Sequence, residues 1–343
     1  MAGENGQPRP DVHEPFETVK VLMGGLIDYA GLFPPAKLDM TASVANYAKY
    51  LGSPEAWMLG RFILPVSRLE EFRAAAGQLL PRTLKEEAEM WEQPWLISAI
   101  IDGDLERDID AVFAFNHRHT QEANGLAIID AVEVKVPAAG EGKGLAGAEF
   151  IDHAIESMPE ELFAFFEIPV LPATVNGAPK LPDIRGMIAA LAGAEAAAKI
   201  RTGGVTPEAF PAPERIAEVL VQCAQADVPF KATAGLHHAI RAHYPLTYEP
   251  NCPRGVMHGF LNLFLAAAFV RTHRFDTPAL VGLLEETDPR AIRFSPTLVS
   301  WHEWALSDPQ LAQARETFAL SYGSCSFNEP VEELQRLGLL PGA

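Results

Sequence analysis

Short apolar segments alternate with segments of helical periodicity along most of the chain. The helical segments place apolar residues at every third or fourth position, which is the pattern of an amphipathic helix. Strand-like and helix-like segments that alternate about every 30 residues are typical of βαβ units and of a parallel sheet. The eight predicted strands lie within residues 24–33, 57–66, 95–102, 125–136, 162–171, 197–204, 228–236 and 318–327.

The last strand-helix unit distinguishes the two common parallel architectures, the closed barrel and the open sheet. Residues 318–327 precede a final helical segment, and eight units ending on a helix favour a barrel over an open sheet. We therefore predict an α/β fold of the TIM (β/α)8 barrel type over residues 16–343, preceded by a flexible tail at 1–15. The seventh and eighth strands lie far apart in the sequence, which predicts a mainly helical insertion at about 243–315. In an alternative, residues 292–301 form the eighth strand.

Composition narrows the range of partners. The 343 residues carry a net charge of -18, which argues against binding to nucleic acid or to an anionic membrane. The apolar segment 259–270 is too short to span a bilayer, and the first residues lack the apolar run of a secretory signal, so we expect a cytoplasmic protein. We expect the partner to be a small anionic or carbonyl compound, and a homo-oligomer is compatible with the sequence.

The three cysteines and the glycine spacing predict no cofactor. Cys223, Cys252 and Cys325 show no CxxC spacing, so neither a disulfide framework nor a structural zinc site is indicated. The TGGV segment at 202–205 has too few glycines for a dinucleotide fingerprint.

Charged residues occur at or near the ends of most of the predicted strands. Barrel enzymes carry their chemistry at the C-terminal ends of the strands. A lysine buried there needs a partner or a depressed pKa. One interpretation is an ion network that closes the barrel; in another, two neighbouring lysines lower the pKa of one, which then attacks a carbonyl to form a Schiff base. The charged residues are Asp28, Arg61, Asp102, Glu133, Lys135, Glu167, Lys199, Arg201 and Lys231.

Two of these lysines lie in motifs that resemble those of the class I aldolases, and of deoxyribose-phosphate aldolase in particular. KIRTG at 199–203 is similar to that family's sixth-strand Lys-x-x-Thr-Gly, and KATAGL at 231–236 is similar to its seventh-strand Lys-Ala-Ser-x-Gly-Ile. The two lysines are 32 positions apart, which is about one strand-to-strand repeat. The resemblance implies that Lys199 forms the Schiff base and that Lys231 is its electrostatic neighbour.

Weaker matches follow the same order, with one departure. LIDYAGLFPP at 26–35, FFEIPVL at 165–171 and YGSCS at 322–326 resemble the family's first, fifth and phosphate-binding eighth strands. EVKV at 133–136 aligns with the fourth-strand Glu-Val-Asp-x, so Lys135 stands where the aldolases keep an aspartate of their proton relay.

These observations predict a class I aldolase-like lyase. It would make or break a carbon-carbon bond of a small oxo compound, with or without a phosphate or carboxylate, through a lysine Schiff base. The predicted catalytic residues are Lys199, Lys231, Lys135, Glu167 and Asp28. The predicted substrate-binding residues are Arg201, Thr202, Thr233, His237, Arg61, Ser324 and Ser326. The two serines belong to a turn before a helix, where an anion can bind.

Two other functions compete with the lyase. The lysine and arginine cluster could stabilise an enolate or carboxylate without a covalent bond, as in an isomerase or decarboxylase. The barrel could also be a non-catalytic ligand-binding or assembly protein, an interpretation motivated by Lys135. A metal site at His237, His238 and His258 is disfavoured because adjacent histidines on an extended strand point to opposite faces, so we predict no metal.

Overall fold

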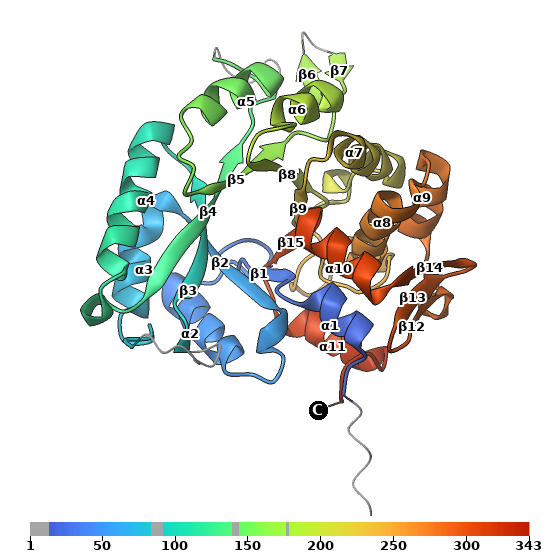
Figure 1. Cartoon of the computed structure of the whole chain (residues 1–343), viewed down its shortest axis with the longest axis horizontal. Coiled ribbons are helices and arrows are strands. Elements are labelled where there is room, and N and C mark those ends of the chain that lie inside the picture. Colours follow the sequence, from blue (N-terminus) through green and yellow to red (C-terminus); the bar gives the residue numbers. More distant parts are fainter. Residues whose placement is uncertain (1–13, 84–91, 139–143, 176–177, 343) are drawn as a thin grey trace, which may run out of the picture.

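Eight parallel strands close into a barrel, as the sequence predicts (Figure 1). The computed structural model describes residues 14–83, 92–138, 144–175 and 178–342. Around the barrel the strands follow the order β1-β15-β9-β8-β5-β4-β3-β2. They are β1 (Ile27–Tyr29), β2 (Leu59–Pro65), β3 (Trp95–Ile101), β4 (Ala127–Lys135), β5 (Phe163–Ile168), β8 (Ala196–Arg201), β9 (Phe230–Thr233) and β15 (Ala319–Ser324). Each lies within its predicted segment, except that β8 begins one residue earlier.

Helices surround the barrel and bury the outer faces of its strands (Figure 1). Several begin where an aspartate side chain accepts a hydrogen bond from a backbone N–H of the first turn, as Asp39, Asp104 and Asp183 do. The helices that follow barrel strands are α2 (Met40–Leu51), α3 (Leu69–Ala76), α4 (Leu105–His119), α5 (Gly147–Glu156), α6 (Ile184–Leu191), α7 (Pro213–Ala226) and α11 (Asn328–Arg336), and α1 (Glu17–Met23) precedes β1. In the predicted tail, residues 1–13 lie outside the described part of the chain.

The long segment between β9 and β15 is more varied than the predicted helical insertion. It contains three helices, α8 (Phe260–His273), α9 (Thr277–Glu285) and α10 (Asp308–Thr317). It also contains two small antiparallel sheets that the sequence prediction missed. One is the hairpin of β10 (Ala242–Pro245) and β11 (Arg254–Met257), and the other comprises β12 (Ile292–Phe294), β13 (Leu298–Trp301) and β14 (Trp304–Ser307).

The second small sheet decides where the eighth barrel strand lies. Residues 292–301 form β12 and β13, which pair with each other and not with the barrel, so the alternative assignment of the eighth strand is wrong.

Helix α8 is apolar on all sides and all of its residues from Phe260 to Val270 are buried, because it packs against α7, α9 and α10. In the described part of the chain no helix is both long enough and apolar enough to cross a membrane.

The interior of the barrel contains an apolar layer and a charged layer. Ala131, Phe165 and Ala197 form a small apolar cluster inside the barrel, separate from the larger core under the helices. Residues two positions further along β4, β5 and β8 share the same inward face because side chains alternate along a strand. Those residues are Glu133, Glu167 and Lys199.

Candidate active site

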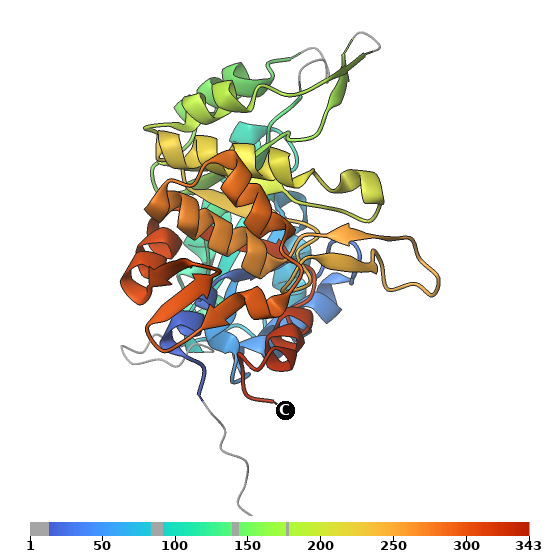
Figure 2. The same cartoon turned by 90° about the vertical axis from the view of Figure 1, so that its right-hand side faces the viewer.

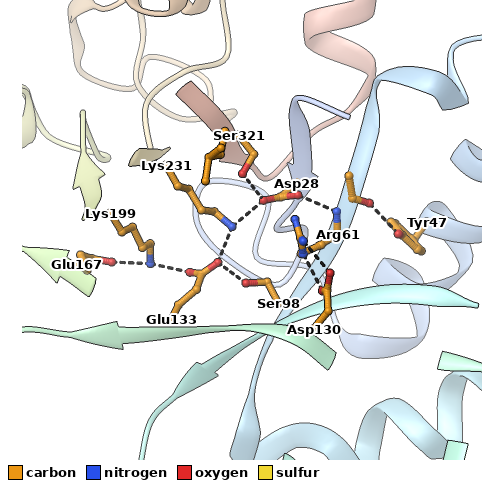
Figure 3. Close-up of polar contacts among 12 residues, drawn as sticks. Asp28, Tyr47, Arg61, Ser98, Asp130, Glu133, Glu167, Lys199, Lys231 and Ser321 are labelled. Carbon is orange, nitrogen blue, oxygen red and sulfur yellow. Dashed lines mark hydrogen bonds and ion pairs between the residues drawn. The ribbon is translucent and has the colours of Figure 1, made fainter. Parts of the chain in front are cut away.

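The predicted lysines and carboxylates meet inside the barrel (Figure 3). The register pairs Lys199 of β8 with Lys231 of β9, and Glu167 of β5 with Lys199. Glu133 of β4 and Asp28 of β1 reach the same space from the other strands. We call Asp28, Glu133, Glu167, Lys199 and Lys231 the central network.

Lys231 occupies the buried end of the central network. Its side chain is 0% exposed, and its ammonium lies 2.6 Å from Asp28 Oδ2 and 2.6 Å from Glu133 Oε1. The ammonium also lies 5.1 Å from the centre of the Phe165 ring, a cation–π distance. Lys231 therefore has two carboxylates and an aromatic face as partners, as a fully buried charge requires.

Asp28 is held from three sides. Its Oδ1 accepts a hydrogen bond from the Arg61 backbone N–H at 2.7 Å, and its Oδ2 accepts one from the Ser321 hydroxyl at 2.8 Å as well as that from Lys231. Gly60 makes room for the carboxylate, because a Cβ atom at that position would lie 2.3 Å from Oδ1. The β1 aspartate is thus a fixed counterion deep in the barrel.

Lys199 lies on the accessible side of the same network. Its ammonium is 2.8 Å from Glu133 Oε2 and 2.5 Å from Glu167 Oε2. Glu133 therefore bridges the two lysines with its two oxygens, and the Ser98 hydroxyl donates to Oε1 at 2.8 Å. Lys199 as a whole is 5% exposed, so it alone of the two lysines reaches solvent.

The carboxylates raise the pKa of Lys199. Burial by itself would lower this pKa, but the charges of Glu133 and Glu167 outweigh it. In the same way the two lysines overcome the burial of Glu133 and hold its pKa far below the usual range, and Lys199 and Arg201 lower the pKa of Glu167. The pKa of Lys199 is therefore raised in this resting arrangement and not lowered as expected from the neighbouring Lys231, because Glu133 lies between the two cations.

Two further cations lie at the rim of the network. Arg201, at the end of β8, pairs with Glu167 through Nε and Oε1 at 3.2 Å, and its side chain is 48% exposed. Lys135 is exposed at the end of β4, where the register pairs it with Glu167. The fourth-strand position that departs from the aldolase pattern is therefore a rim position in this barrel.

The hydroxyls expected to bind substrate are partly used within the protein. The Thr202 hydroxyl donates to the Ala234 carbonyl at 2.7 Å and so ties together the loops that follow β8 and β9. The Ser324 hydroxyl donates to the Ser326 carbonyl at 2.6 Å, and the Ser326 hydroxyl accepts from the Glu329 backbone N–H at the start of α11. Thr233 is two residues beyond Lys231 and shares its inward face.

Arg61 does not lie where the sequence prediction placed it. It is the third residue of β2, which continues to Pro65, so it belongs to the N-terminal half of the strand. Its guanidinium makes two hydrogen bonds of 2.7 Å to the carboxylate of Asp130 on β4, and both side chains are partly exposed. Only its backbone N–H contacts the central network, so we correct its predicted role in substrate binding.

The histidines do not gather around one point. His237 pairs with Glu329 at 2.9 Å, whereas the His238 ring stacks on Tyr244 with 3.4 Å between ring centres and contacts Glu333. His258 Nε2 lies 2.8 Å from the Pro211 carbonyl, and burial lowers the pKa of His258 to about 4. Within the ranges that the structure describes, no three His, Cys, Asp or Glu side chains are placed to hold a metal ion.

Several residues of the site escaped sequence reasoning. Ser98 and Ser321 donate to the carboxylates of the central network, and Asp130 neutralises Arg61. Each is a polar residue inside a predicted barrel strand, and that is the signal that could have identified it. The hydrogen-bonding partners themselves could not be assigned, because they depend on which strands are neighbours.

Comparisons with known proteins assign neither a family nor a function to this chain. The sequence matches no model of a known protein family, and it matches no curated protein.

Proposed function

We propose that this protein is a barrel enzyme that makes or breaks a carbon-carbon bond of a small oxo compound through an imine at Lys199. The observation that carries the proposal is the asymmetry of the two lysines. Both contact Glu133, but Lys231 is completely buried, while Lys199 lies next to the partly exposed Glu167 and the rim residue Arg201. A substrate that enters from the rim meets Lys199 first.

Glu167 supports the first step as a proton acceptor. Its Oε2, 2.5 Å from the Lys199 ammonium, takes a proton as the carbonyl carbon approaches. The neutral nitrogen then forms the N–C bond, the carbonyl oxygen is protonated, and loss of water leaves an iminium ion. The iminium accepts the electron pair of the breaking carbon-carbon bond while the hydroxyl on the departing carbon loses its proton, so that this fragment leaves as a carbonyl compound. The resulting enamine is protonated at carbon and hydrolysed to release the second product.

The charges of the network support the iminium more than the free amine. Three carboxylates, those of Asp28, Glu133 and Glu167, are paired with the cations of Lys199, Lys231 and Arg201. An iminium keeps the positive charge that Glu133 and Glu167 stabilise, whereas a neutral Lys199 removes it. Preorganised carboxylates therefore favour the charged covalent intermediate.

One observation favours a second candidate. The raised pKa of Lys199 means that the resting side chain is an ammonium ion, which can stabilise an enolate or carboxylate without forming a bond. Such an enzyme would be of the isomerase or decarboxylase type. The two candidates differ in whether the Lys199 nitrogen becomes bonded to the substrate.

Reductive trapping separates the candidates. The protein is incubated with acetaldehyde, pyruvate or hydroxyacetone in the presence of borohydride, and modified peptides are located by mass spectrometry. We expect an adduct at Lys199 that is absent from Lys199→Arg and unchanged in Lys49→Met, a surface control on α2. An activity found separately that survives Lys199→Arg, together with no trapping at Lys199, would establish the non-covalent candidate instead.

A further inference from the structure

A cavity lies at the same end of the barrel as Lys199, beside the β10–β11 hairpin. Its volume is about 330 Å³, at the lower end of the range for small-molecule sites. It is lined by residues that follow three neighbouring barrel strands: Pro35 after β1, His237 after β9 and Glu329 after β15. Leu246 and Met257 of the hairpin segment form part of an apolar wall. Figure 2 shows this hairpin projecting from the body of the barrel.

Glu329 organises the polar side of the cavity. Its Oε2 accepts hydrogen bonds from His237 Nδ1 at 2.9 Å and from the Tyr248 hydroxyl at 2.9 Å. These partners outweigh the effect of burial and lower the pKa of Glu329, so it is ionised. Because the carboxylate accepts from Nδ1–H, the orientation of the His237 ring is fixed.

His237 Nε2 is the hydrogen-bonding atom that the protein leaves open. His237 is 8% exposed, and within the described ranges of the chain its ring hydrogen bonds through Nδ1 and not through Nε2. In neutral imidazole this nitrogen accepts a hydrogen bond, and in the cation it donates one. A hydroxyl group both donates and accepts, so it can pair with Nε2 in either state.

The charge of the cavity disfavours an anion. The Glu329 carboxylate and Glu249 both line it, and no lysine or arginine does so among the described residues. The hydroxyls of Ser324 and Ser326, which were expected to hold an anion near this strand, make hydrogen bonds within their own turn. A phosphate or carboxylate placed here would be desolvated next to like charge.

We infer that this cavity binds an uncharged, hydroxyl-bearing part of the substrate through His237 Nε2 and excludes phosphate and carboxylate groups. The inference rests on the proposed function only in calling the ligand a substrate. The anionic group of a charged substrate would then lie toward Arg201 at the end of β8, and the polyol end toward His237 in the loop after the neighbouring β9. His237 is thereby assigned as a specificity-determining residue.

Glycerol and glycerol 3-phosphate form a matched pair of probes for this cavity. Both are titrated into protein labelled with ¹⁵N at histidine, and the His237 ring signals are followed by NMR. We expect glycerol to shift the Nε2 signal saturably, and glycerol 3-phosphate to shift it at least about tenfold more weakly. Glycerol has no carbonyl group, so its binding does not depend on imine formation at Lys199, and a failure of trapping at Lys199 leaves this result unaffected.

Three variants test whether glycerol binding and the exclusion of phosphate depend on the residues of this cavity. Glu329→Gln removes the charge while keeping the shape, and we expect it to reduce the discrimination against glycerol 3-phosphate. His237→Phe should abolish glycerol binding measured by ligand-observed NMR, whereas His243→Gln, on the same hairpin but outside the cavity, should leave it within about twofold. Tighter binding of glycerol 3-phosphate than of glycerol, or no shift of His237 with either probe, would overturn the inference.

Discussion

The two lysines of the central network lie in neighbouring strands and share Glu133, yet their surroundings differ in one decisive respect. Lys231 is enclosed by Asp28, Glu133 and the Phe165 ring, with no access to solvent. Lys199 lies between Glu133 and Glu167 at the accessible side. The same residue type can therefore be a structural cation on one strand and a candidate nucleophile on the next, and the difference is which end of the network faces the rim.

The largest expected effect is the loss of stability on removing the enclosed lysine. Lys231→Met leaves the Asp28 and Glu133 carboxylates buried with one cation fewer, which should cost about 3–5 kcal/mol of unfolding free energy. Lys199→Met should cost clearly less, because Glu167 keeps Arg201 and can be reached by water. Urea unfolding of both variants measures the difference. Equal losses would contradict the division into an enclosed and an accessible lysine.

A steric change tests the enclosed side without altering charge. Gly60→Ala places a Cβ atom where Asp28 Oδ1 lies, and we expect a loss of about 1–3 kcal/mol in unfolding free energy. Gly52→Ala at the end of α2 is the control, because a Cβ there makes only ordinary contact, 3.7 Å from the Lys49 carbonyl. Thermal and urea unfolding of the pair give the comparison. If the two alanine variants are equally stable, the Asp28 carboxylate is not confined as described.

The smallest effect concerns the acid dependence of stability. Glu133 and Glu167 have lowered pKa values in the folded protein, so they stabilise it above their unfolded pKa of about 4.3. That stability is lost as the pH falls from this value through the folded values. Lys199→Met removes a cation that lowers both, so the loss between about pH 5 and pH 3 should be smaller by about 1 kcal/mol than in the wild type. Urea unfolding across this range measures it, and an unchanged acid dependence would speak against ionised carboxylates around Lys199.

The raised pKa of Lys199 also determines how the stability of the fold changes at alkaline pH. A group whose pKa is raised on folding contributes stability below its unfolded pKa of about 10.4, and that contribution disappears as the pH rises through the folded value. At neutral pH, therefore, Lys199 stabilises the fold as an ammonium ion, and its use as a nucleophile requires proton transfer to Glu167.

The arrangement of strands was predictable because it depends on local pattern. Each of the eight barrel strands lies in an apolar segment followed by helical periodicity, and Lys199 and Lys231 lie one repeat apart on neighbouring strands. The β10–β11 hairpin and the β12–β14 sheet were missed because their strands are short, three to four residues each, and give little periodicity.

The positions of individual side chains were less predictable. Arg61 was expected at the end of its strand, but β2 continues for four more residues and the Arg61 guanidinium pairs with Asp130. The pairing could not be derived from the sequence, because it joins β2 to β4 across the barrel interior. The strand end is decided by how far neighbouring strands hydrogen bond, which is a tertiary property.

By itself, the sequence determined that this chain forms a parallel barrel and that charged residues lie along its inner face, since periodicity and strand alternation are local. Only the tertiary structure decided that Glu133 lies between Lys199 and Lys231, so that the pKa of Lys199 rises where two neighbouring lysines alone would lower it. It also brought Glu329 to His237 from 92 residues away. Electrostatic effects depend on distances between atoms, and closing the barrel is what establishes those distances.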